Sequence, residues 1–75
     1  KEQKMRTVTL VVVPGTGARL LEVEDTMTVA ELVTRESLFG RDIIINGVGV
    51  QPTQFNTQTL TGAVEIFATG SVKGN

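Results

Sequence analysis

The sequence contains no cysteine and no histidine among its 75 residues. The absence of cysteine excludes disulfides and thiolate metal sites, and it removes the thiolate nucleophile. The absence of histidine removes the commonest general base and the commonest metal ligand. We therefore expect a protein that is not an enzyme and that has no catalytic site, no cofactor and no metal.

The sequence also lacks an excess of charge of either sign. Lys and Arg number 7 against 8 Asp and Glu, which gives a net charge of -1, and the basic residues are scattered along the chain. Nucleic-acid binding requires clustered cations that neutralise phosphates. We therefore expect no nucleic-acid partner.

Long hydrophobic runs are missing as well. The longest, at residues 10–13, is far shorter than the roughly 20 residues that a membrane-spanning helix needs. The charged residues at the start lead into no signal-peptide core. We expect one small domain that has no membrane contact and is cytoplasmic.

Two segments typical of β-strands open the chain. Residues 6–13 are β-branched and partly alternating, and the turn pair Pro14-Gly15 follows them. Residues 18–24 alternate between apolar and polar side chains over most of their length. The short glycine-rich link between the two segments predicts an antiparallel hairpin.

A helix start follows the hairpin. Thr28 and Glu31 have the spacing of a capping box, in which each side chain binds the backbone N–H of the other residue. Leu32 lies on the apolar face that the helical period predicts. The helix is expected over about residues 28–38, with Gly40 as the glycine that ends it.

The second half of the chain predicts three further elements and a tail. Residues 42–46 form a strand, an Asn-Gly pair turns the chain, and residues 48–50 form a short return strand. Residues 53–61, rich in Thr and Gln, are expected to form a loop. Residues 63–68 form the last strand, and residues 70–75 are expected to form a flexible tail.

The element order ββαβ(β)β predicts an α+β fold in which one helix crosses one face of a single mixed sheet. The apolar runs at 10–13 and 64–67 are explained if the first and last strands pair in parallel at its centre. The domain is expected to cover residues 6–69, after a disordered segment 1–5 and before the tail 70–75. The expected core comprises Val29, Leu32, Val33, Leu38, Ile43, Ile45, Phe55, Leu60, Val64 and Ile66.

Five short segments together carry a resemblance to a known family. They are Thr-Val-Ala-Glu-Leu at 28–32, Ile-Asn-Gly at 45–47, Val-Gln-Pro at 50–52, Leu-Thr-Gly at 60–62 and Val-Glu-Ile at 64–66. Their order and spacing resemble the ubiquitin-like β-grasp superfamily, and within it the sulfur-carrier proteins of thiamine and molybdopterin biosynthesis. The resemblance implies a β-grasp fold.

The end of the chain departs from that family. Its carriers end in Gly-Gly, and an activating enzyme adenylates and then thiolates the terminal carboxylate. This chain ends in Val-Lys-Gly-Asn and lacks a C-terminal Gly-Gly. The hypothesis that follows is a small non-catalytic ubiquitin-like protein, acting as a protein–protein interaction module or as a subunit of a larger assembly.

The alternative hypothesis keeps the family's chemistry. The chain would then be a sulfur carrier or protein modifier, activated at its tail by an adenylating enzyme after trimming to Gly74. The candidate tail site comprises Gly70, Lys73 and Gly74. Both hypotheses require a protein partner, which the sequence does not identify.

A candidate interaction surface lies on the first and last strands, at Val8, Leu10, Val12 and Phe67. Both faces of the first strand are apolar, and an exposed apolar patch usually marks a partner surface. The other interpretation is that this strand is simply the buried middle of the sheet.

Glu22 and Glu24 stand two residues apart on one face of the second predicted strand. Paired carboxylates perform acid–base chemistry when they share a dry cleft. An alternating strand also places such residues on its solvent side, and we expect the solvent side here.

Overall fold

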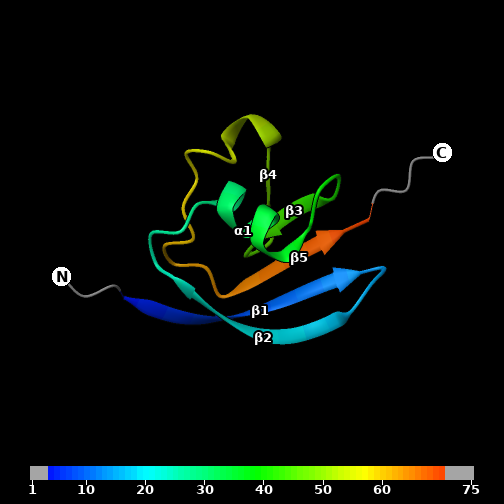
Figure 1. Cartoon of the computed structure of the whole chain (residues 1–75), viewed down its shortest axis with the longest axis horizontal. Helices are drawn as coiled ribbons and strands as arrows, with labels where there is room; N and C mark the ends of the chain where they lie inside the picture. Colours follow the sequence, from blue (N-terminus) through cyan, green and yellow to red (C-terminus); the bar gives the residue numbers. More distant parts are fainter. Residues whose placement is uncertain (1–3, 71–75) are drawn as a thin grey trace.

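The computed structural model describes residues 4–70, and it shows an α+β fold with one five-stranded mixed sheet and one α-helix (Figure 1). The predicted α+β class, with one helix and a single mixed sheet, is thus confirmed. Its elements in chain order are β1 (Met5–Val13), β2 (Gly17–Glu24), α1 (Val29–Glu36), β3 (Asp42–Ile45), β4 (Val48–Val50), the 3₁₀ helix η1 (Pro52–Gln54) and β5 (Glu65–Thr69).

The strands are ordered β2-β1-β5-β3-β4 across the sheet. β1 and β5 pair in parallel, as predicted, and every other neighbouring pair is antiparallel. β1, β5 and β3 are therefore interior strands, whereas β2 and β4 form the two edges (Figure 1). Central placement explains why β1 and β5 carry the apolar runs of the sequence.

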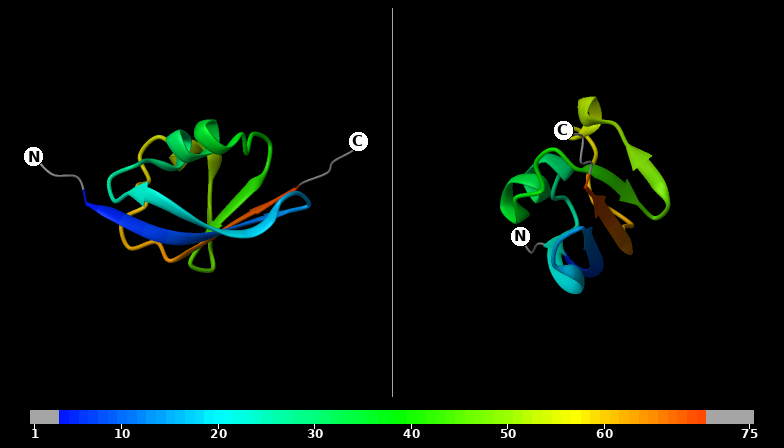
Figure 2. Two further views of the ribbon diagram at one scale, coloured as in Figure 1. Left: turned by 60° about the horizontal axis from the view of Figure 1, so that its bottom comes forward. Right: turned by 90° about the vertical axis from the view of Figure 1, so that its right-hand side faces the viewer.

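The core fills the space between one face of the sheet and α1, which lies across that face (Figure 2). Its buried residues are Val8, Leu10, Val12, Val23, Val29, Leu32, Val33, Leu38, Ile43, Leu60, Ala63, Ile66 and Ala68. Of the predicted core, Ile45 and Phe55 are only partly buried and pack against this cluster. Among the helices of residues 4–70, none is long and apolar enough to cross a membrane.

Val64 was predicted to be in the core and is instead 65% exposed. The prediction assumed that the last strand begins at residue 63, but β5 begins at Glu65. Ala63 and Val64 precede the regular strand, and Ala63 takes the buried position. Strand alternation therefore does not extend back to Val64.

The helix begins as predicted and ends earlier. Thr28 and Glu31 form both hydrogen bonds of the capping box, each 3.1 Å long. The helix ends at Glu36, because Ser37 takes a left-handed conformation with φ 58. Gly40, predicted to end the helix, lies beyond it.

A Schellman motif closes this end of α1. The Ser37 N–H donates to the Thr34 carbonyl, and the Leu38 N–H donates to the Val33 carbonyl at 2.9 Å. This turn brings Leu38, which is 2% exposed, back into the core. Because the left-handed residue is Ser and not Gly, the sequence carried no clear stop signal at this position.

The first strand begins one residue earlier than predicted. Met5 belongs to β1, and the Lys4 carbonyl accepts a hydrogen bond from the Asp25 N–H at 2.8 Å. Lys4 and Met5 both fall within the segment 1–5 that the sequence predicted to be disordered. The rest of that segment, and residues 71–75 of the predicted tail, lie outside the described residues.

Candidate functional site

The two faces of the sheet differ in what covers them. On β1, Val8, Leu10 and Val12 are buried on the side of α1. The residues between them point to the opposite face, because side chains alternate along a strand. No helix or strand of residues 4–70 lies over that opposite face (Figure 2). We call it the helix-free face.

An apolar row crosses the helix-free face from strand to strand. Ala18 of β2 pairs with Val11 of β1. Val11 in turn pairs with Phe67 of β5, and Phe67 pairs with Ile44 of β3. Ala18 is exposed and the other three are half-buried. Neighbouring strands lie about 4.8 Å apart, so these four residues, the apolar row, form one continuous stripe.

Two further apolar side chains border the apolar row. Leu20 on β2 is 72% exposed, and Val13 at the end of β1 is 51% exposed. Both occupy alternate positions that point away from α1. The row and its borders form a contiguous apolar surface with an aromatic ring near its middle. Surfaces of this kind usually mark a binding site.

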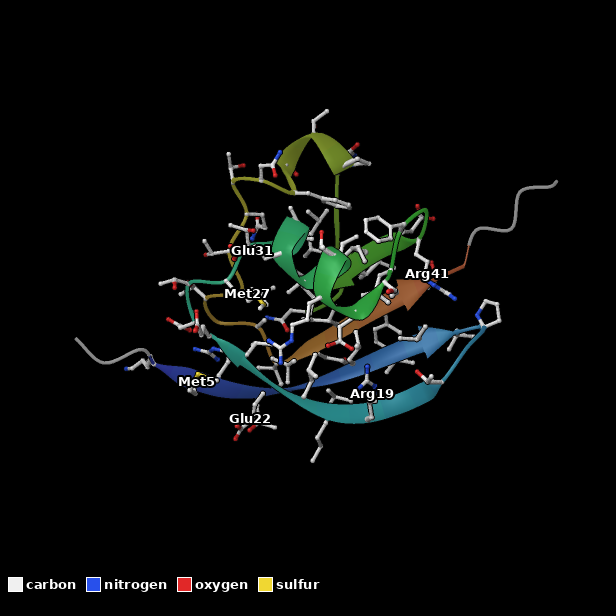
Figure 3. All side chains as sticks on the ribbon, in the orientation of Figure 1. Met5, Arg19, Glu22, Met27, Glu31 and Arg41 are labelled. Atoms are coloured by element: carbon white, nitrogen blue, oxygen red, sulfur yellow. The ribbon has the colours of Figure 1, made fainter. Side chains whose placement is uncertain are left out.

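Four carboxylates share the helix-free face with the apolar row, and two of them lie directly beside it. Glu65 occupies the next position of this face on one side of the row, and Asp42 the next position on the other side. Glu22 and Glu24 lie farther along β2 on the same face, separated from Ala18 of the row by Leu20. Figure 3 shows Glu22 leaving β2 on the side opposite to Arg19. Within residues 4–70, none of these four carboxylates has an ion-pair or hydrogen-bond partner.

The other carboxylates of residues 4–70 are engaged in structural contacts. Asp25 accepts a hydrogen bond from Arg6 at 2.8 Å, which ties the start of β1 to the end of the hairpin. Glu36 is paired with Arg19, and this contact joins α1 to β2. Glu31 caps α1. Among residues 4–70, the carboxylates without a partner are therefore those on the helix-free face.

The residues of the predicted interaction surface lie on two different faces of the sheet. Val8, Leu10 and Val12 are 1%, 0% and 6% exposed. These three side chains belong to the core, because β1 is an interior strand and they face α1. They are not accessible to a partner, and their assignment to a surface is corrected. Phe67 differs, because it is half-buried on the helix-free face.

Ile44 and Ala18 belong to the apolar row, and the sequence analysis did not identify either of them. A signal for Ile44 was present, because it is the middle residue of three consecutive isoleucines. In a strand the middle residue must point away from both neighbours, and Ile43 was already assigned to the core. Ala18 carried no such signal, since only the register of β1 and β2 places it beside Val11.

Of the candidate tail site, Gly70 lies among the described residues, whereas Lys73 and Gly74 lie outside them. The Gly70 N–H donates to the Val13 carbonyl at 2.7 Å, so Gly70 continues the pairing of β5 with β1. A Cβ atom at Gly70 would lie 2.5 Å from Cδ of Pro14 and 3.2 Å from Nη1 of Arg41. Both groups therefore lie close to the position that a side chain would occupy, and a larger residue would clash with the Pro14 ring.

Glu22 and Glu24, considered for acid–base chemistry, are exposed on the helix-free face. An open hollow lies elsewhere, beside α1, and contains the single carboxylate of Glu31, which the capping box already uses. Among residues 4–70, no three acidic side chains are grouped so that they could hold a metal ion. The helix-free face is therefore the feature that we consider as the functional site.

The sequence matches no protein-family model and no functionally curated protein. The structure is similar to the NMR solution structure of a structural-genomics protein from Arabidopsis thaliana, with a TM-score of 0.58. The similarity covers 92% of this chain and 89% of that chain, at 22% sequence identity. At this identity the likeness shows the fold alone, a small α+β domain with a mixed sheet and one helix.

Proposed function

We propose that this chain is a non-catalytic, ubiquitin-like β-grasp protein that acts as a protein–protein interaction module or as a subunit of a larger assembly. The β-grasp assignment is supported by the strand order, with parallel β1 and β5 at the centre and α1 after the first hairpin. The partner binds the helix-free face.

The apolar row is the observation that carries this proposal. Protein interfaces place apolar and aromatic side chains at their centre and polar groups at their rim. The helix-free face has this arrangement, with Phe67 and Ile44 in the row and carboxylates around it. A partner that covers the row removes apolar surface from water, which is the dominant favourable term in association.

Substitution of one row residue tests the proposal, with a matched control on the neighbouring strand. Ile44→Ser removes an apolar side chain from the row on β3. Val48→Ser makes the same kind of change on β4, at a residue that is 67% exposed and points to the other face. Each variant and the unchanged chain are used as bait in an extract of the native source, and the retained proteins are compared.

We expect the unchanged chain and Val48→Ser to retain the same partner, and Ile44→Ser to lose it. Circular dichroism verifies that both variants are folded. If Ile44→Ser proves unstable, Ala18→Gln disturbs the row at an exposed position without removing a core contact. Retention of the same partner by every row variant would contradict binding through the helix-free face.

A sulfur carrier or protein modifier is the second candidate, and the course of β5 favours it. This interior strand leads directly through Gly70, which passes Pro14 and Arg41 without a side chain. The intact mass of the chain from its native source tests this candidate. Trimming to Gly74 with added sulfur or a conjugate supports it, whereas an unmodified chain that ends at Asn75 contradicts it.

A further inference from the structure

We propose that the partner segment on the helix-free face is a basic amphipathic α-helix that lies across the strands. This inference rests on the proposed function and names the chemistry of its partner. Two properties of the face carry it: the direction of the apolar row and the positions of the carboxylates that have no partner in residues 4–70.

The direction of the row favours a helix. The row runs perpendicular to the strands, with one side chain per strand and a spacing of about 4.8 Å. A helix presents one side chain of its apolar stripe per turn, with a pitch of about 5.4 Å. An extended segment in the same direction would present side chains on one side at intervals of about 6.8 Å. Successive turns of a helix therefore match Ala18, Val11, Phe67 and Ile44 more closely than an extended segment does.

The carboxylates favour a partner helix that carries basic residues on both sides of its apolar stripe. Glu65 lies beside the row on one side and Asp42 beside it on the other, and Glu22 lies farther from the row on the same side as Glu65. No Lys or Arg occupies a strand position that points to this face within residues 4–70. Charges arranged in this way select a partner of the opposite sign and increase its rate of association.

The same charges disfavour two other occupants. A second copy that docked by the same face would bring Glu65 and Asp42 toward carboxylates of the partner copy, and like charges across an interface are costly. An anionic membrane surface attracts basic segments and repels acidic ones. A basic helix is the occupant that satisfies both the row and its acidic borders.

A titration of the full chain, labelled with ¹⁵N, tests the inference. The first probe is a synthetic amphipathic helical peptide with a leucine stripe bordered by lysine and arginine. The second has the same leucine stripe bordered by glutamate. The third keeps the lysine and arginine but has serine in place of leucine. We expect the first peptide to shift the amide resonances of Val11, Phe67 and Ile44 and to bind more weakly as salt is added.

Two variants of the chain measure how much the carboxylates contribute to binding of the first peptide. Glu65→Gln and Asp42→Asn each remove one negative charge from the border of the row. Each is expected to weaken binding of the first peptide by about 1.5- to 5-fold, as for exposed charge pairs. Thr34→Lys changes the net charge by the same amount on the exposed side of α1, and it should leave the affinity within the error of the titration.

The outcomes separate this inference from the proposed function. Equal shifts in the apolar row from the lysine and glutamate peptides would overturn the basic partner and still support apolar docking. Equal binding of the serine peptide would overturn the inference, because charge alone would then suffice. If neither leucine peptide shifts the row, both the basic partner and the docking face are contradicted.

Discussion

Asn46 shows how one side chain organises several backbone segments. Its Oδ1 accepts hydrogen bonds from the Val64 N–H at 2.9 Å and the Glu65 N–H at 3.1 Å, and its Nδ2 donates to the Gly62 carbonyl at 3.1 Å. Its own backbone has φ 52, a conformation that asparagine adopts more readily than most residues. Asn46 thus both makes the turn after β3 and fixes the entry into β5.

We expect Asn46→Ala to lower the free energy of unfolding by about 2–3 kcal/mol, from the lost hydrogen bonds and the left-handed backbone together. Asn46→Gly loses the same hydrogen bonds but adopts positive φ without strain. It should therefore be about 1 kcal/mol more stable than Asn46→Ala. Urea unfolding measures both variants. Equal stability of the two would show that the backbone conformation of Asn46 has no energetic role.

Gly70 makes a second prediction at the scale of single residues. A Cβ atom there meets the rigid ring of Pro14 at 2.5 Å, so Gly70→Ala should destabilise by about 1–3 kcal/mol. Gly49→Ala is the control, because a Cβ at Gly49 has open space around it. That substitution should be neutral or slightly stabilising. Thermal unfolding compares the two, and an unaffected Gly70→Ala variant would exclude the close packing described for Gly70.

At the scale of elements, α1 depends on its cap because it is short. Its eight residues make about two turns, and isolated helices of this length are marginal in water. Thr28→Ala should therefore cost about 1 kcal/mol of stability, and Thr28→Ser should restore most of it. Thr34→Ala, at an exposed position within α1, is the control. Urea unfolding measures the stability of the three variants. If Thr28→Ala is as stable as the unchanged chain, the cap does not stabilise α1.

The elements also show how far the sequence determines the fold. The hairpin, the capping box at Thr28 and the turn at Asn46 follow from local chemistry, and the sequence predicted all three. The end of α1 at Glu36 and the exposure of Val64 depend on tertiary packing, which no local pattern encodes. The apolar row depends on register across four strands, so the sequence identified Phe67 but not Ala18 or Ile44.

At the scale of the whole molecule, the sheet is covered by α1 on one face and presents the apolar row on the other (Figure 2). A chain of this size builds a single core, and the buried residues all belong to that core. The apolar row lies outside that core, although Val11, Phe67 and Ile44 are half-buried. We propose that its apolar side chains contact a partner.

The most direct test of this account measures which side chains the partner covers. A soluble paramagnetic agent broadens the methyl resonances of exposed side chains, and it is applied to the free chain and to its complex with the partner purified from the native source. The account predicts that the methyls of Val11 and Ile44 become protected in the complex, whereas those of Val48 remain accessible. Protection of Val48 with no change at Val11 and Ile44 would contradict it.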